Sequence, residues 1–374
     1  MKILHWTDCY YPGPHLGGAP LFVSNLSQEQ RNNGHEVMVV TEQVEDWNDH
    51  DNYDGVDVYR FPFTMAALDG NLKEMHRLSI AGAAIKNKLQ PDIIHVHLNQ
   101  VTAWFDVLSK SRAKFPSIVT VHPPIGMTSL PETMVRRILA ENDIIVAVSR
   151  SQKNDIDHFL GDDSKTRVIH NGIPPIATQV LPLPFKPAVV LCIGRLHKTK
   201  GFDVALKACA KVLAERPGSI KVIIAGNGPE RENLQDLSEE FGTAAELFEF
   251  RGWVDPDEVA VILNQGTIVL MPSVWDEPFG LVAAQAAQMG RPVIGSNIGG
   301  IPEVVVDKKT GLLVQPGNVD ELADAMLFLL TNAEFTITLG ENARKIAKDR
   351  FSMAACAANY QSIYENLLCG EKLC

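Results

Sequence analysis

Short apolar runs alternate with helix-length segments along almost the whole chain, and this alternation limits the possible folds more than any other feature. Continuous Val and Ile runs, rather than two-residue alternation, indicate strands that are buried on both faces, so we expect mainly parallel sheets covered by helices on each side. Strands in the first half are predicted at Ile3–Thr7, His35–Thr41, Val56–Phe61, Asp92–His97, Ser117–His122, Asp143–Val148 and Arg167–His170. Helices are predicted near residues 20–33, 71–89, 99–110, 131–140 and 150–159.

A proline-rich segment interrupts the alternation at residues 174–187. Five prolines lie between Ile173 and Pro187, and proline at this density continues neither a helix nor a central strand. The pattern then restarts, with strands predicted at Ala188–Gly194, Ile220–Gly226, Leu247–Gly252, Thr267–Pro272, Pro292–Asn297 and Gly311–Val314, and closing helices near 318–331, 333–349 and 352–368.

These patterns predict two doubly wound α/β domains that face a central cleft. The first domain covers residues 1–173, residues 174–187 form a linker, and the second domain covers residues 188–351. The last helix, within residues 352–374, is long enough to cross back to the first domain. Two domains of this kind suit a ligand with two parts, and closure of the cleft would exclude water.

Charge and composition limit the partners. The net charge of −11 argues against nucleic acid or a strongly anionic membrane as the main partner, because both select for basic surfaces. The chain starts without an apolar signal core and has no uninterrupted apolar stretch of ~18–20 residues, so we expect a cytoplasmic protein with at most peripheral membrane contact. The 6 cysteines are scattered and lack zinc-ligand spacing, which indicates reduced thiols.

The second half carries a predicted anion site. Arg195 and Lys200 flank a strand-to-helix turn, where both could reach a phosphate group, although solvated basic residues at a helix end are the alternative. Glu277 lies in a second strand-to-helix junction, whose helix is predicted to begin at Phe279. Cations, free N–H groups and a carboxylate at one sheet edge match a diphosphate attached to a group with hydroxyls.

The first half offers fewer candidates. Gly17 and Gly18 precede a helix that is predicted to begin near Ala19, and glycine there lets the backbone approach a phosphate, although a turn alone would also explain them. His122 ends a buried strand and could accept a hydrogen bond from a substrate hydroxyl, although most histidines are structural. His95 and His97 are interpreted as structural, and no metal site is predicted.

Several motifs in order along the chain resemble one enzyme family. They are LGGAP at 16–20, GHEV at 34–37, VTVHPP at 119–124, VSRS at 148–151, VIHNGI at 168–173, GRLHKTKGFD at 194–203, AGNGPE at 225–230 and EPFGLVAAQA at 277–286. With them the chain resembles retaining, nucleotide-sugar-dependent glycosyltransferases of the GT-B fold, which has two Rossmann-like domains. This family includes sucrose-phosphate synthases and bacterial mannosyl and polysaccharide glycosyltransferases.

The resemblance implies roles for particular residues. Arg195, Lys200 and the Gly18 backbone would bind the donor diphosphate, while the backbone at Phe279, Gly280 and Leu281 would hold sugar and phosphate. The expected catalytic residues are Glu277, which would bind hydroxyls of the donor sugar, and His122, which would lie near the transferred sugar. Trp253 and Val254 would contact the nucleobase and Gln285 the ribose. No metal is required, because cations and helix N–H groups would stabilise the leaving diphosphate.

Two positions depart from the family pattern. The second Glu of the Glu-seven-residues-Glu motif is Gln285 here, and Pro174 stands where the family often has Asp. We expect transfer of a hexose, in particular glucose from a UDP-sugar, to a glycan, lipid-linked or small-molecule acceptor in polysaccharide or glycoconjugate synthesis. GDP-mannose as donor, a nucleotide-sugar epimerase and a non-catalytic sugar-nucleotide-binding protein are the alternatives. The acceptor would contact loops expected at 9–18, 42–55, 62–70 and 122–130.

Overall fold

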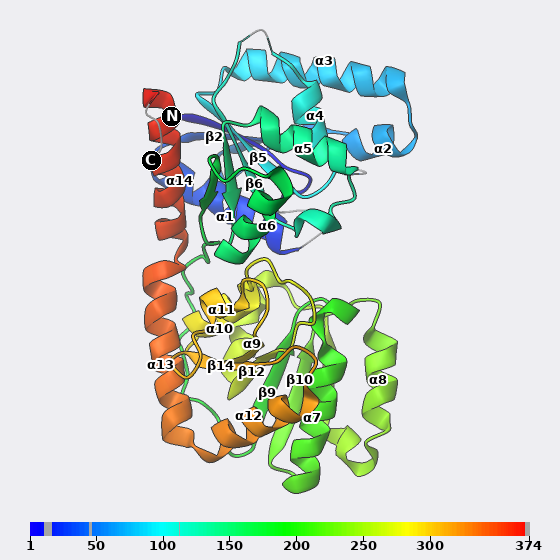
Figure 1. The fold of residues 1–374 in the computed structure, drawn as a ribbon, viewed down its shortest axis with the longest axis vertical. Coiled ribbons are helices and arrows are strands. Elements are labelled where there is room, and N and C mark those ends of the chain that lie inside the picture. Colours follow the sequence, from blue (N-terminus) through cyan, green and yellow to red (C-terminus); the bar gives the residue numbers. More distant parts are fainter. Residues whose placement is uncertain (11–16, 45–46, 112, 371–374) are drawn as a thin grey trace. The chain divides into compact units, whose positions relative to one another are not determined.

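The chain forms two α/β units, and the computed structural model describes residues 1–10, 17–44, 47–111 and 113–370 (Figure 1). The first unit contains Met1–Pro174 together with the chain from Met353 onward, and the second contains Pro175–Ser352. Each unit is built around one sheet with Rossmann-like topology, so the predicted α/β class with two parallel sheets is confirmed.

The first unit has an 8-stranded sheet in the order β3-β4-β2-β1-β5-β6-β7-β8. All neighbouring strands are parallel except β3 and β4. The strands are β1 (Lys2–Trp6), β2 (Glu36–Glu42), β3 (His50–Tyr53), β4 (Val56–Phe61), β5 (Ile93–Leu98), β6 (Ser117–Val121), β7 (Ile144–Ala147) and β8 (Thr166–Val168). The helices are α1 (Gly18–Asn32), α2 (Phe63–Leu68), α3 (Leu72–Leu89), α4 (Thr102–Leu108), α5 (Glu132–Glu141), α6 (Arg150–Leu160) and α14 (Met353–Cys369), with a 3-10 turn at Ile125–Met127.

The prediction missed β3 and α2, which occupy parts of two expected loops. β3 is a short polar edge strand, so it lacks the apolar run by which the other strands were found. It pairs antiparallel with β4 through a two-residue turn in which Asp54 and Gly55 both have positive φ angles, of 49° and 84°. An Asp-Gly pair between two strands is a strong hairpin signal, and it was present in the sequence.

The C-terminal helix α14 belongs to the core of the first unit, as predicted. It packs against α1, and both helices cover the same face of the sheet (Figure 1). Tyr360 and Tyr364 are fully buried on this face among side chains such as Ile3 and Phe22. On the opposite face Leu4, Trp6 and other alternate residues of the strands pack under the remaining helices.

The second unit has a 6-stranded parallel sheet in the order β11-β10-β9-β12-β13-β14. Its strands are β9 (Ala188–Ile193), β10 (Ile220–Ala225), β11 (Phe248–Gly252), β12 (Ile268–Met271), β13 (Val293–Ser296) and β14 (Gly311–Val314). Its helices are α7 (Phe202–Glu215), α8 (Arg231–Glu239), α9 (Val259–Gln265), α10 (Leu281–Gln288), α11 (Ile301–Val304), α12 (Val319–Thr331) and α13 (Ala333–Arg350), with 3-10 turns at Lys198–Lys200, Gly242–Leu247 and Pro256–Glu258.

The proline-rich segment contains no helix or strand between β8 and β9. Part of it is bound to the second unit, because Asn264 accepts a hydrogen bond from the Leu181 N–H at 3.0 Å and donates one to the Gln179 carbonyl at 2.7 Å. The buried guanidinium of Arg291 also donates to the Leu181 carbonyl at 2.6 Å. The middle of the segment is therefore tied to this unit by side chains of α9 and of the turn after α10.

The strand order of the second unit reverses between β9 and β12, and ligands of open α/β sheets bind at such a point. The loops that follow neighbouring strands pack closely here. A Cβ on Gly226, which directly follows β10, would lie 1.8 Å from the carbonyl oxygen of Gly194, which directly follows β9. Only glycine permits this contact, which supports the loop that carries Arg195.

Among the described residues, each helix taken alone is too short or too polar to span a membrane. Helices α12 and α13 meet the criteria of length and composition only as a pair, and the pair is bent by 101° at its break.

We predict that Tyr360→Ala destabilises the first unit by about 3–5 kcal/mol, because it leaves a cavity under α14. Tyr360→Phe, which loses only the hydroxyl, should cost about 1 kcal/mol. Hydrogen exchange of peptides from α1 and α14 would measure the effect on this unit separately. Equal exchange rates in Tyr360→Ala and Tyr360→Phe would show that the Tyr360 ring does not help to pack α14 against the first unit.

We predict that Gly226→Ala costs the second unit clearly more free energy of unfolding than Gly218→Ala. Both glycines have a positive φ, and that strain alone costs about 1–2 kcal/mol. A Cβ on Gly218 meets nothing within 4 Å, so this variant measures the strain of a φ of 71° without a clash, whereas Gly226 has a φ of 147° and meets a backbone oxygen as well. Hydrogen exchange in β9 and β10 would monitor the denaturant unfolding of both variants. Equal losses of unfolding free energy would show that the Gly226 contact is easily relieved.

Candidate functional site

Two loops of the second unit meet at the reversal point of its sheet. The loop after β9 carries Arg195 and Lys200, and the loop after β12 carries Glu277. The Val274 N–H donates a hydrogen bond to the Thr199 carbonyl at 2.9 Å, so the two loops are joined through their backbones. The structure therefore brings Lys200 and Glu277 together, and Arg195 lies on the same loop as Lys200.

The carboxylate of Glu277 is almost buried and is held through one of its two oxygens. Oε2 accepts hydrogen bonds from the Lys200 ammonium at 2.7 Å, the Trp275 indole N–H at 3.0 Å and the Ser273 hydroxyl at 3.2 Å. Within the described part of the chain, Oε1 accepts no hydrogen bond. Three donors thus compensate the burial of the charge and leave the second oxygen available to a ligand.

A glycine pair after β13 also supports Glu277. Gly300 donates its N–H to the Glu277 carbonyl at 2.7 Å, and a Cβ on Gly299 would lie 2.5 Å from the same oxygen. This pair and the roles of Ser273 and Trp275 were not predicted from the sequence. The signal for the first was the Gly-Gly dipeptide between a strand and a short helix, which indicates a close backbone approach.

The helix after Glu277 starts later than predicted. α10 begins at Leu281, and not at Phe279, because Gly280 adopts a left-handed conformation with φ of 98°. The Phe279 side chain is buried against Phe351, with ring centroids 5.5 Å apart, which fixes the loop from the core side. No side chain caps α10, so the N–H groups of its first turn, from Leu281 onward, have no helical acceptor.

The other predicted donor-site residues of this unit have fewer contacts. The side chain of Arg195 is exposed and makes no hydrogen bond or ion pair to any described residue. Gln285 lies one turn along α10 from Leu281 and is half-buried. Trp253 and Val254 follow the edge strand β11, and the Trp253 ring is 53% exposed while its N–H donates to Asp255 at 3.0 Å. A large exposed aromatic side chain at the carboxyl edge is available for stacking.

Two predicted site residues belong to the first unit. Gly18 is the first residue of α1, whose amino end is exposed and has no side-chain cap; the proline-rich loop before it, at 11–14, lies outside the described residues. His122 directly follows β6 and is half-buried beside Phe22, at a ring-centroid distance of 5.6 Å. Burial lowers the pKa of His122 to about 4, so its imidazole is neutral near pH 7.

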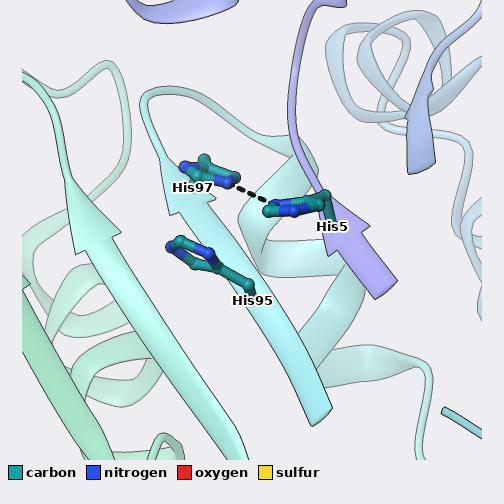
Figure 2. Close-up of side chains that lie close together, drawn as sticks. All are labelled: His5, His95 and His97. Atoms are coloured by element: carbon teal, nitrogen blue, oxygen red, sulfur yellow. Dashed lines mark hydrogen bonds between the residues drawn. The ribbon is translucent and has the colours of Figure 1, made fainter. Parts of the chain in front are cut away.

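Three buried histidines, His5, His95 and His97, are the only group of side chains among the described residues that approaches a metal-ligand arrangement (Figure 2). Their ring nitrogens are already used by the protein. His5 bonds to His97 and Gln30, His95 bonds to Tyr364 and Thr120, and His97 bonds to His122. A metal would have to displace these hydrogen bonds, so the structural interpretation of His95 and His97 agrees with the geometry.

Comparisons with known proteins agree with this architecture. Residues 16–175 match the family "Glycosyltransferase Family 4" and residues 175–346 match "Glycosyl transferases group 1". The chain is 29% identical to a D-inositol 3-phosphate glycosyltransferase of Corynebacterium glutamicum over 86% of its own length and 81% of the relative.

Two solved structures share the fold. Sucrose-phosphate synthase from Thermosynechococcus elongatus has a TM-score of 0.80 at 21% identity, covering 99% of this chain and 100% of that chain. Anabaena HepE in complex with UDP-glucose has a TM-score of 0.74 at 19% identity, covering 98% of this chain and 100% of that chain. The two sequence families together span both units, and the chain belongs to the glycosyltransferases of the GT-B type.

Proposed function

We propose that this glycosyltransferase transfers a hexose from a nucleotide sugar, in particular glucose from UDP-glucose, with retention of the anomeric configuration and without a metal. The observation that carries the proposal is the Glu277 carboxylate. One of its oxygens accepts from three donors, the other has no partner among the described residues, and α10 begins at Leu281 in the same loop. A free carboxylate oxygen next to backbone N–H groups suits a ligand with hydroxyls and phosphates. HepE, which shares the fold, binds UDP-glucose.

In this proposal the second unit binds the donor. Arg195, which has no partner among the described residues, and Lys200 bind the diphosphate, with the N–H groups at Phe279, Gly280 and Leu281. Glu277 Oε1 accepts hydrogen bonds from hexose hydroxyls, Gln285 binds the ribose, and Trp253 with Val254 contacts the base. From the first unit, the Gly18 backbone approaches the diphosphate and His122 the hexose.

The charges support a metal-free mechanism. Cleavage of the anomeric C–O bond leaves negative charge on the nucleoside diphosphate, and the acceptor hydroxyl passes its proton to the departing phosphate oxygen as the new C–O bond forms. Arg195, Lys200 and the N–H groups of α10 stabilise that charge as it develops. The acceptor, a glycan, lipid-linked or small-molecule hydroxyl, attacks from the face that the diphosphate leaves.

We predict that UDP-glucose raises the unfolding temperature of the second unit and that Arg195→Ala abolishes most of the shift. A ligand at ~100 times its Kd stabilises by about 2.7 kcal/mol, which thermal unfolding detects readily. Arg216→Ala removes the same charge from the opposite end of α7 and should keep the full shift. UDP-, GDP- and ADP-sugars would be compared with and without EDTA.

Three results would overturn parts of this proposal. Normal donor binding by Arg195→Ala would show that Arg195 does not bind the diphosphate. Donor binding that EDTA abolishes would contradict the metal-free mechanism. A product that is only the epimer of the donor sugar, formed without any acceptor, would indicate an epimerase.

We predict that Gln285→Glu keeps transfer activity and tightens donor binding about five- to tenfold. A hydrogen bond from a ribose hydroxyl to a carboxylate is stronger by roughly 1 kcal/mol than one to a neutral amide. Isothermal titration with UDP-glucose would measure the change, with Gln235→Glu on α8 as the control for added charge. Unchanged affinity, or complete loss of transfer, would show that Gln285 does not contact the ribose.

A further inference from the structure

A continuous chain of hydrogen bonds runs through the first unit and ends at His122. Gln30 Oε1 lies 2.7 Å from His5 Nε2, His5 Nδ1 lies 2.9 Å from His97 Nε2, and His97 Nδ1 lies 3.0 Å from His122 Nε2. Figure 2 shows the link between His5 on β1 and His97 on β5. Gln30, His5 and His97 are buried, and nothing in the proposed donor site requires them.

The direction of each hydrogen bond follows from the first one. An amide oxygen only accepts, so the Gln30 Oε1 contact requires a proton on His5 Nε2. A neutral His5 then has a lone pair on Nδ1, which accepts from His97 Nε2–H. By the same rule His97 Nδ1 accepts from His122 Nε2–H, and this leaves a lone pair on His122 Nδ1.

A second set of bonds agrees with this direction. With Oε1 of Gln30 toward His5, its Nε2 donates to the Tyr364 hydroxyl at 3.1 Å. The Tyr364 hydroxyl, having accepted that bond, donates to His95 Nδ1 at 2.7 Å, and His95 Nε2–H donates to Thr120 Oγ1 at 2.8 Å. Tyr364 on α14 thereby links the Gln30 amide to His95.

The chain keeps one direction only while its imidazoles are neutral, because an imidazolium donates from both nitrogens. Burial lowers the pKa of His5 to about 4 and holds the pKa of His95 and His97 well below the usual value. Neutral, head-to-tail imidazoles are therefore the stable arrangement near pH 7.

We propose that Gln30, His5 and His97 are positioning residues that hold His122 as the neutral Nε2–H tautomer, with a lone pair on Nδ1. This inference rests on the proposed function, in which His122 lies beside the transferred hexose. His122 Nδ1, which has no partner among the described residues, accepts a hydrogen bond from a sugar hydroxyl. A carboxylate or carbonyl oxygen of a sugar at this point would face the Nδ1 lone pair with no proton between them. The hydrogen-bond chain therefore selects neutral hexoses over uronic acids.

Nuclear magnetic resonance measures the tautomer directly, without substrate. Long-range ¹⁵N–¹H correlations of the full chain with ¹⁵N-labelled histidine distinguish Nε2–H, Nδ1–H and imidazolium forms. The signals of His122 are identified by their loss in His122→Asn. We expect His122 as the Nε2–H form at pH 7; the Nδ1–H form or an imidazolium would overturn the proposal.

A variant at Gln30, at the other end of the hydrogen-bond chain from His122, tests the chain itself. Gln30→Met keeps the side-chain length but removes the acceptor of His5, so we expect a detectable share of Nδ1–H at His122. Gln28→Met is the matched control, because Gln28 lies on the same helix and bonds to the Tyr53 carbonyl instead. An unchanged His122 spectrum in Gln30→Met would overturn the proposal.

Binding provides the second measurement. Gln30→Met should weaken UDP-glucose binding in proportion to the lost Nε2–H form of His122, about twofold when half of it has changed tautomer, while UDP without the hexose binds as before. An equal loss for UDP and UDP-glucose would indicate a general structural defect and overturn the positioning role. If neither ligand binds the wild-type chain, the proposed donor fails, whereas the tautomer result stands or falls independently.

Discussion

Parallel pairing of β9 with β10 and β12 is the constraint on which the geometry of the candidate site in the second unit depends. Because these strands run in the same direction, the loops that follow them leave the sheet at one edge and share limited space. Gly226 lets two of them touch backbone to backbone, and the bond from Val274 to Thr199 joins the third. Arg195, Lys200 and Glu277 are thereby held on short, tightly packed loops.

Burial of a carboxylate costs free energy unless hydrogen bonds compensate it. At Glu277 one oxygen receives these hydrogen bonds, and the other receives none from the described residues. All three side-chain donors meet at Oε2, including Lys200, while the main chain is held by Gly300. The carboxylate is thus oriented before any ligand arrives. Preorganised charges of this kind act on a developing transition state without further reorganisation.

Most of the fold was predictable because continuous apolar strands and proline-rich breaks are local signals. The two elements that were missed have weak local signals: β3 is polar and α2 spans only 6 residues. The start of α10 was misplaced because Phe279 looks helical by composition, whereas its ring is held in the core beside Phe351 and Gly280 takes a positive φ. Tertiary packing overrides propensity at such element ends.

The sequence by itself determined which residues stand at the carboxyl ends of strands, since burial and periodicity mark the strands and their order along the chain. It therefore placed Arg195, Lys200, Glu277 and His122 at sheet edges. Only the tertiary structure decided their partners: which donors meet Glu277 Oε2, and how Gln30, His5 and His97 reach His122. His5 and His97 are separated by 92 residues and meet because β1 and β5 are neighbours. Apolar periodicity encodes which face of a strand is buried, but contacts between polar side chains depend on strand order and register across the sheet.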